Sequence, residues 1–306
     1  MTPSANRVLL VFIDGMGIGT AEPGVNPWLG AQLPNFRELF GGRIPVLGDV
    51  SGNEAGDGAA SWVAADATLG VAGLPQSGTG QTALLTGENA AREFGRHFGP
   101  WIPTVLRDLL AQRNLLSRAA AAGERVAFAN AIPRPSPPGE VPRRPGAVPL
   151  AAQLAGVLDR HLEALREGRA VASSITNERW RRHFPEVEEI APEAAGERLS
   201  HISRQAELTL FAHYDTDYVG HRGDLSEAVA VLERVDRFLS GVLAGLPGDT
   251  LLVIASDHGN IEDASVGHTT NPVPVIAVGP GAEPLVRGVR SITDVAPALL
   301  RVLNVD

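Results

Sequence analysis

Short, uninterrupted runs of apolar residues are the most regular feature of this chain. A run of this length is typical of a strand that is buried on both faces of a sheet. We therefore predict strands at residues 7–13, 125–129, 208–212, 251–255 and 273–278. Between them, apolar residues recur with helical spacing, which predicts helices at residues 104–112, 115–122, 149–166, 224–245 and 292–303, with a short helix at 82–85. Residues 41–80 are rich in Gly, Ala and short polar residues, and we predict loops with brief elements there.

Strands that alternate with helices indicate an α/β protein. We expect a three-layer α/β/α sandwich with a mostly parallel sheet. Proline is dense from residue 132 to 139, where it can continue neither a helix nor a central strand. We interpret this stretch as the entry into a small inserted cap, residues 132–190, and we assign residues 1–131 and 191–306 to the core.

Composition narrows the chemistry and the partners. The chain has no Cys, so a metal must be held by His, carboxylate and hydroxyl groups. Its net charge is −9 and it has no basic tail, which argues against nucleic acid as a partner. The apolar runs are too short to cross a membrane. We expect a cytoplasmic protein with no membrane partner.

Acidic and imidazole side chains follow three of the predicted strands. Asp14 follows the first strand, and Asp217 with His221 comes after the strand at 208–212. Asp257 and His258 follow the strand at 251–255, and a later segment adds His268. Parallel strands would gather these groups at one edge of the sheet, where ligands bind in α/β proteins. Mixed oxygen and imidazole ligands suit Zn²⁺ or Mn²⁺, and their number suits two ions rather than one.

Five motifs together resemble the alkaline phosphatase superfamily, with cofactor-independent phosphoglycerate mutase and phosphopentomutase as the nearest named branch. They are Asp14-Gly-Met-Gly17, Ser77-Gly-Thr-Gly-Gln-Thr82, Asp217-Tyr-Val-Gly-His221, Asp257-His258-Gly-Asn260 and His268-Thr-Thr-Asn-Pro-Val-Pro274. The stretch from Asp66 to Arg96 is similar to short metalloenzyme-domain proteins of that branch. The resemblance covers roughly residues 7–17, 64–131, 205–222 and 251–303.

The resemblance implies a role for each motif. One ion would be held by Asp217, His221 and His268, and the other by Asp14, Asp257, His258 and the nucleophile. Manganese or zinc is expected, with magnesium as a further candidate. The nucleophile falls on Ser77, and Thr79 is its rival because it is also hydroxylic and lies two residues away.

Several neighbours of these motifs are candidates for supporting roles. His213 and Asp215 lie beside the metal motif, and Asn271 lies near His268. They would contact a metal ligand or the substrate, with ordinary structural hydrogen bonds as the alternative. Arg92 and Arg96 follow the nucleophile segment and would face a substrate phosphate, with exposed salt bridges as the alternative.

The expected activity is hydrolysis of a small phosphomonoester through a phosphoserine intermediate. The phosphoglycerate mutases carry a large inserted domain that retains the substrate, whereas the insertion here is short and the chain has no Lys. Phosphomutase and phosphodiesterase are therefore the alternatives. A sulfatase motif is not present around Ser77. A non-catalytic metal-binding protein is the alternative of a different class, and the retained Ser77 argues against it.

Overall fold

A single six-stranded sheet forms the centre of the protein. The computed structural model describes residues 5–50, 60–134 and 141–305. Within them the strand order is β2-β6-β5-β1-β4-β3. The strands are β1 (Arg7–Ile13), β2 (Ala60–Ala65), β3 (Val126–Phe128), β4 (Leu208–His213), β5 (Thr250–Ala255) and β6 (Val273–Val278). Neighbours are parallel from β3 through β4 and β1 to β5, and β6 runs antiparallel to both β5 and β2. The predicted, mostly parallel α/β sandwich is confirmed.

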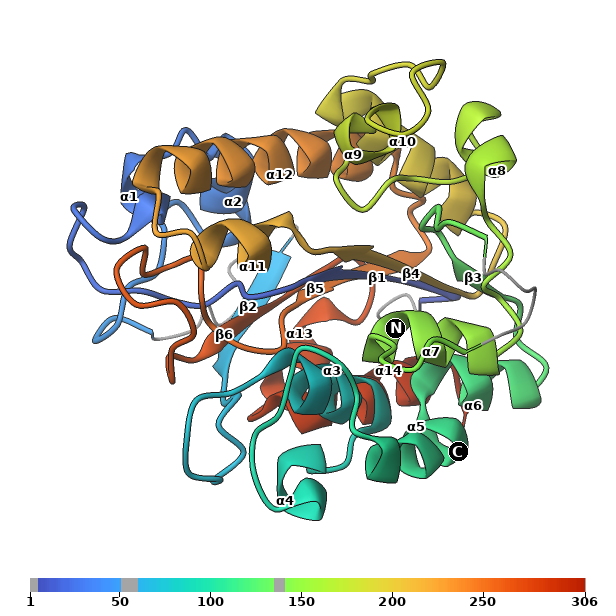
Figure 1. Cartoon of the computed structure of the whole chain (residues 1–306), viewed down its shortest axis with the longest axis horizontal. Coiled ribbons are helices and arrows are strands. Elements are labelled where there is room, and N and C mark those ends of the chain that lie inside the picture. Colours follow the sequence, from blue (N-terminus) through green and yellow to red (C-terminus); the bar gives the residue numbers. More distant parts are fainter. Residues whose placement is uncertain (1–4, 51–59, 135–140, 306) are drawn as a thin grey trace.

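Helices cover both faces of this sheet (Figure 1). One layer contains α1 (Pro27–Gly30), α2 (Pro34–Leu39), α10 (Pro192–Ser203), α11 (Asp215–Gly220) and α12 (Leu225–Gly245). The other contains α3 (Ser77–Thr86), α4 (Ala90–Phe94), η1 (Thr104–Leu106), α5 (Arg107–Arg113), α6 (Leu115–Ala121), α7 (Ala147–Leu154), α13 (Ala282–Arg287), η2 (Ile292–Asp294) and α14 (Val295–Val302). Two short helices, α8 (Leu162–Arg166) and α9 (Glu178–Arg181), lie in the predicted cap.

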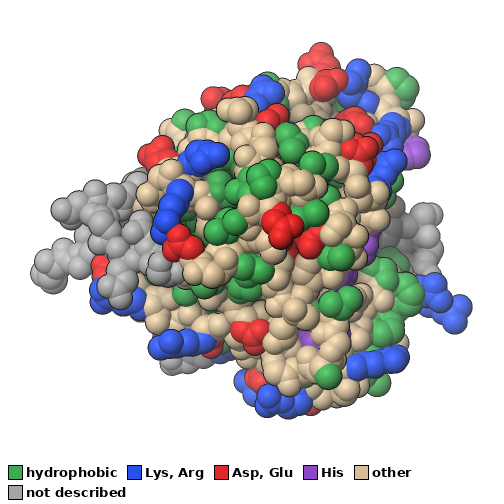
Figure 2. Space-filling model, turned by 90° about the vertical axis from the view of Figure 1, so that its left-hand side faces the viewer, with side chains coloured by type: hydrophobic (Ala, Val, Ile, Leu, Met, Phe, Trp, Pro, Cys, Tyr) green, Lys and Arg blue, Asp and Glu red, His purple; other side chains and the backbone are tan. Residues whose placement is uncertain are grey.

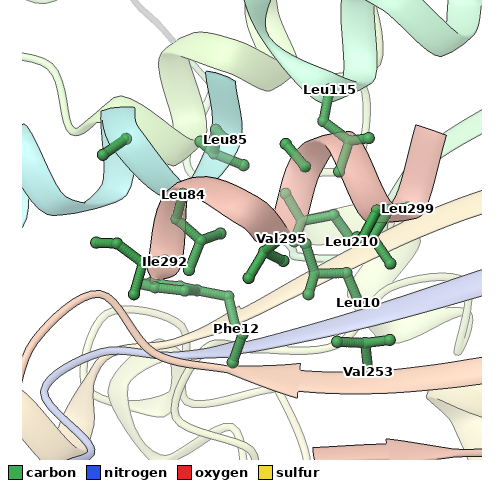
Figure 3. Close-up of a cluster of buried hydrophobic side chains, with 14 of the residues drawn as sticks. Leu10, Phe12, Leu84, Leu85, Leu115, Leu210, Val253, Ile292, Val295 and Leu299 are labelled. Carbon is green, nitrogen blue, oxygen red and sulfur yellow. The ribbon is translucent and has the colours of Figure 1, made fainter. Parts of the chain in front are cut away.

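Alternation along β1 divides the core between the two helical layers. Leu10 and Phe12 pack with Leu84, Leu85 and Leu299 on the α3 side, as Figure 3 shows. The intervening Leu9, Val11 and Ile13 pack on the other side, among residues of α10 and α12. Successive side chains of a strand point to opposite faces, so a strand that is apolar at every position must be covered on both. This explains the uninterrupted apolar runs in the sequence.

The helix boundaries differ from the predictions in several places, and the helix predicted at 104–112 begins with a 3₁₀ turn, η1, before α5. The short helix predicted at 82–85 begins earlier, at Ser77, and the predicted helix at 149–166 is two helices, α7 and α8. The helix predicted at 292–303 opens with a 3₁₀ turn, η2. Strand β2 and helix α10 were not predicted. Four of the six residues of β2 are Ala or Ser, so its sequence carries little of the apolar signal of a strand.

The segment predicted as a cap contributes to two different parts of the core. Its residues 135–140 lie outside the described residues. Helix α7 packs against α3, α5 and α6, and therefore belongs to the main core layer. The remainder gathers around a small separate cluster that includes Ala131, Leu165, Trp180 and Val187.

The surface carries charges of both signs. On the face shown in Figure 2, the basic and acidic side chains are interspersed among the residues drawn in colour. Among the described residues, the helices are all too short or too polar to cross a membrane.

Candidate active site

The carboxyl end of β1 brings Asp14 to the centre of the site. Its backbone N–H donates to the carbonyl of His213 at 2.9 Å, which fixes the ends of β1 and β4 against each other. Gln81 Nε2 donates to Asp14 Oδ2 at 3.0 Å. The other carboxylate oxygen, Oδ1, is buried and has no hydrogen-bond partner among the described residues.

The neighbouring strand β5 ends at the same edge and presents Asp257 and His258. Both side chains are fully buried. His258 Nε2 lies 3.4 Å from Asp14 Oδ1 and 3.6 Å from Asp257 Oδ2. Asp257 Oδ2, like Asp14 Oδ1, is buried and has no hydrogen-bond partner in the described structure.

Ser77 faces this group from the first residue of α3. Its Oγ lies 3.1 Å from His258 Nε2. Thr79, the rival nucleophile, is turned elsewhere, because its hydroxyl donates to the carbonyl of Gln76 at 3.2 Å and accepts from the N–H of Phe98 at 3.1 Å. The structure therefore brings Ser77, and not Thr79, to the carboxylate and imidazole groups.

A second group lies beside the first and is formed by α11 and the segment after β5. His268 Nε2 lies 3.2 Å from Asp217 Oδ1 and 3.0 Å from His221 Nε2. His221 Nε2 lies 3.5 Å from Asp217 Oδ2. Asn260 Nδ2 donates to both the carbonyl and Oδ1 of Asp217, the latter at 2.6 Å, and so fixes the carboxylate. All seven residues predicted as metal ligands thus lie together at one edge of the sheet.

The donor atoms fit two cations. Asp14, Asp257 and His258 offer ligand atoms within 4.8 Å of one another, and so do Asp217, His258 and His268. His268 Nδ1 lies 2.7 Å from the carbonyl of Pro75, which holds the ring with its other nitrogen, Nε2, facing the site. Carboxylate oxygens that are buried here without a hydrogen-bond partner are costly unless a cation lies beside them.

The pKa values of the buried carboxyl groups also favour bound cations. Burial raises the pKa of Asp14 well above its ordinary value, and the charge of Asp217 raises it further. Burial, followed by the charge of Asp14, does the same to the pKa of Asp257. Burial would also raise the pKa of Asp217, but its hydrogen bond with His268 and the charge of His258 outweigh burial and bring this pKa to about 2. The site thus holds more buried negative charge than its surroundings compensate.

The three predicted supporting residues His213, Asp215 and Asn271 have different partners. His213 is buried, its Nδ1 donates to the carbonyl of Ser173 at 2.7 Å, and burial lowers its pKa. Asp215 pairs with Arg179 at 2.6 Å, on the face of α11 away from Asp217. Asn271 Nδ2 donates to Glu262 Oε1 at 3.1 Å, so it ties the segment that follows His268 to Glu262.

The two arginines predicted near the substrate lie apart from the carboxylates. Arg92 is exposed on α4, and Arg96 is exposed just after this helix. The guanidinium of Arg96 lies over the ring of Phe94, 5.7 Å from its centroid. A role for either residue in binding phosphate stays a prediction.

Sequence reasoning missed two residues that support the site, Gln81 and Glu262. Gln81 lies one helical turn after Ser77, and a helix that begins at Ser77 puts both on the same face. Glu262 is fully buried and accepts hydrogen bonds from the backbone N–H groups of Gly17 and Asn260, and from the side chains of Thr269 and Asn271. Burial raises its pKa. An acidic residue five positions after Asp257 was the available signal, but its partners could not be read from the sequence.

The fold and this site are similar to those of known proteins. Residues 187–306 match the model of the Metalloenzyme superfamily. Over the whole chain, the fold is similar to alkaline phosphatase from the Antarctic bacterium TAB5, with a TM-score of 0.55, 14% identity and full coverage of both chains. It is also similar to PH0037 protein from Pyrococcus horikoshii, with a TM-score of 0.61 and 13% identity over 100% of this chain and 98% of that one. The fold is that of the alkaline phosphatases.

Among curated proteins, the relatives are 2,3-bisphosphoglycerate-independent phosphoglycerate mutases. The protein from Agrobacterium fabrum is 44% identical over 115 residues, which are 34% of this chain and 22% of the relative. A relative from Cereibacter sphaeroides is 33% identical over 161 residues, 47% of this chain and 31% of its own. The chain thus spans less than a third of the length of these relatives. The predicted resemblance to metalloenzymes of the alkaline phosphatase superfamily, and to these mutases, is confirmed.

Proposed function

We propose that this protein is a metal-dependent phosphomonoester hydrolase that works through a phosphoserine on Ser77. The observation that carries the proposal is the position of Ser77 Oγ, which lies 3.1 Å from His258 Nε2 beside two buried carboxylates. A hydroxyl in this position serves as a nucleophile when its proton is removed, and the amino end of α3 favours the resulting negative charge.

Two divalent ions are proposed as the cofactors. Asp217, His221 and His268 would hold one, and Asp14, Ser77, Asp257 and His258 would hold the other. Manganese or zinc suits this mixture of oxygen and nitrogen donors, with magnesium as a further candidate. When bound, such ions lower the pKa of a coordinated hydroxyl and compensate charge on phosphoryl oxygens.

The chain's own residues account for the remaining steps. A bond forms from Ser77 Oγ to phosphorus as the ester P–O bond breaks, and the departing alcohol takes up a proton. Water then cleaves the Oγ–P bond, releasing phosphate and returning the proton to Ser77. Gln81 and Asn260 hold Asp14 and Asp217 in place throughout. The cap, residues 132–190, is proposed to cover the substrate.

The first prediction is that Ser77→Ala abolishes phosphate release. Removing a nucleophile costs several orders of magnitude in turnover, so we expect at least a 1,000-fold loss of kcat, measured on a panel of phosphomonoesters with Mn²⁺ or Zn²⁺ present. Thr79→Ala is the matched control and should retain phosphoryl transfer. Mass spectrometry of an acid-quenched reaction should find phosphate on Ser77, and phosphate on Thr79 would overturn the assignment.

The second candidate function is phosphomutase, which the curated relatives favour. With 3-phosphoglycerate as substrate, a mutase would yield 2-phosphoglycerate, whereas a hydrolase would release inorganic phosphate. A diester panel tests phosphodiesterase activity in the same way. If Ser77→Ala and the wild type bind metal equally and neither turns over any ester, the protein is a metal-binding protein without catalysis.

A further inference from the structure

A mostly apolar pocket of about 270 Å³ lies where β3 and β4 meet the cap. Its wall includes Phe128 of β3, Ile132 after this strand, Tyr214 after β4, and Trp180 and Phe184 from the cap. We call it the aromatic pocket. Its volume is that of roughly nine water molecules, which corresponds to a group of one or two rings.

The aromatic pocket lies on the same sheet edge as the candidate metal ligands. β3 is the neighbour of β4, and β4 is the neighbour of β1, so the edge runs from the pocket to Asp14 across two strand spacings, roughly 10 Å. Tyr214 joins the two places, because its ring packs against Phe12 of β1 with centroids 6.3 Å apart. Burial raises the pKa of Tyr214, and the charges of Asp14 and Asp257 raise it further.

The pocket also lies on the face of the sheet that carries the nucleophile. Phe128 and Tyr214 pack with the core cluster on the α3 side. Pro149 of α7 lines the pocket, and α7 packs directly against α3, whose first residue is Ser77. The pocket and Ser77 therefore lie on the same face and at the same edge of the sheet.

The wall is mostly carbon surface, although Ser173, Arg179 and His183 also line it. Asn130 already uses both side-chain amide atoms on the backbone of Ala212, at 2.7 and 2.8 Å. Trp180 and Phe184 present two rings with centroids 5.7 Å apart. A polyol placed against these rings would lose hydrogen bonds to water, whereas an aromatic or other apolar ring would bury surface against them.

A larger cleft of about 470 Å³ does not compete for this role. It lies between α9, α11 and α12, and its lining includes Asp215, Tyr218 and Arg222. Asp215 and Tyr218 lie on one face of α11 and Asp217 lies on another. Most side chains that line the cleft are charged, so it does not suit an apolar ring.

We propose that the aromatic pocket binds the alcohol part of the substrate, and that this part carries an apolar ring. The inference rests on the proposed hydrolase function. It distinguishes this chain's substrate from a small, wholly polar phosphorylated acid or polyol.

The test compares esters whose leaving alcohols have similar intrinsic reactivity. We expect kcat/KM for 3-phenylpropyl phosphate to exceed that for propyl phosphate and glycerol phosphate by at least tenfold. Trp180→Ala and the milder Trp180→Leu should reduce this preference at least fivefold, mainly through KM for 3-phenylpropyl phosphate. Val105→Ala, at a side chain that is 70% exposed, is the control and should leave the preference unchanged.

Binding separates a failure of this inference from a failure of the proposed function. In Ser77→Ala with metal, 3-phenylpropylphosphonate should bind at least tenfold more tightly than propylphosphonate, and Trp180→Leu should remove the difference. If esters are hydrolysed but the phenyl group and Trp180 have no effect, the pocket inference is wrong and the hydrolase stands. If no ester is hydrolysed but the binding preference depends on Trp180, the pocket is supported and the hydrolase fails.

Discussion

Ser77 and Thr79 are two hydroxyl residues on the same first turn of α3, and their surroundings separate them. Ser77 faces His258, while Thr79 hydrogen-bonds to backbone groups of Gln76 and Phe98. The glycine between them is required by packing, since a Cβ on Gly78 would lie 2.2 Å from the carbonyl oxygen of Trp101. The motif thus combines one hydroxyl that faces the candidate ligands with residues that bring α3 close to the next loop.

The identity of the candidate ligands could be predicted from sequence, but their supports could not. Carboxylate and imidazole residues after buried strands are visible in the sequence, because strand ends are local features. Gln81 and Glu262 act through contacts with distant residues, Asp14 and Gly17, which only the folded chain brings near. The helix start at Ser77 was obscured by two glycines, which usually indicate a loop.

A pH-dependent contribution to stability is expected from Glu207. Its hydrogen bonds with Arg125 lower its pKa to about 2. A carboxyl whose pKa is lower in the folded state stabilises the fold above its unfolded pKa, near 4.5, and this contribution is lost as the pH falls from there toward 2. Because Arg125 is largely exposed, Glu207→Gln should cost at most about 1 kcal/mol at pH 7.

Urea unfolding at pH 7 and at pH 3.5 measures this contribution. The difference between wild type and Glu207→Gln should be smaller at the lower pH. A difference that stays constant, or grows, would show that Glu207 acts through packing rather than charge.

At the scale of elements, α10 and α12 approach each other unusually closely. A Cβ on Gly241 of α12 would lie 2.0 Å from the carbonyl oxygen of Glu193, and one on Gly196 of α10 would lie 2.1 Å from that of Phe238. Each helix thus places a glycine against the backbone of the other. Neither glycine has a positive φ, so the requirement is for space rather than for a special backbone conformation.

Gly241→Ala should therefore destabilise the protein by about 2 kcal/mol or more, although alanine is the better helix former. The free energy of unfolding in urea, with far-ultraviolet circular dichroism as the signal, measures this. Gly30→Ala is the control, because a Cβ there would meet nothing closer than Val229 at 3.9 Å. Equal stability of the two variants would contradict the close contact.

At the scale of the whole molecule, the fold class was predictable and the strand order was not. Uninterrupted apolar runs indicate strands that are buried on both faces, and helical spacing indicates helices that are buried on one face. Together these two patterns predict an α/β sandwich. The reversal at β6 and the outer position of β2 depend on pairing between distant segments, Trp62 with Ile276 for example. No local pattern encodes that register.

Metal binding should couple to the stability of the entire fold. Burial raises the pKa of both Asp14 and Asp257, the charge of Asp217 raises that of Asp14 further, and the charge of Asp14 raises that of Asp257 further. Bound cations would relieve this cost. At a metal concentration 100 times the dissociation constant, each ion should add about 2.7 kcal/mol. We expect Mn²⁺ or Zn²⁺ to raise the melting temperature by several degrees and a chelator to reverse the effect.

Asp257→Asn provides the matched variant. It removes one buried negative charge, so the metal-free protein should melt at a higher temperature than the metal-free wild type, while the gain from metal should largely disappear. A metal response in this variant equal to that of the wild type would remove Asp257 from the ligand set.

The central position of β1 has a consequence for synthesis of the chain. β1 is made first, yet its partners are β4, from Leu208, and β5, from Thr250. At a translation rate of 5–20 residues per second, this mostly apolar strand leaves the ribosome roughly 10–40 s before the first strand that can pair with it. The nascent protein must therefore shield β1, or rely on chaperones to do so, until β4 has been made.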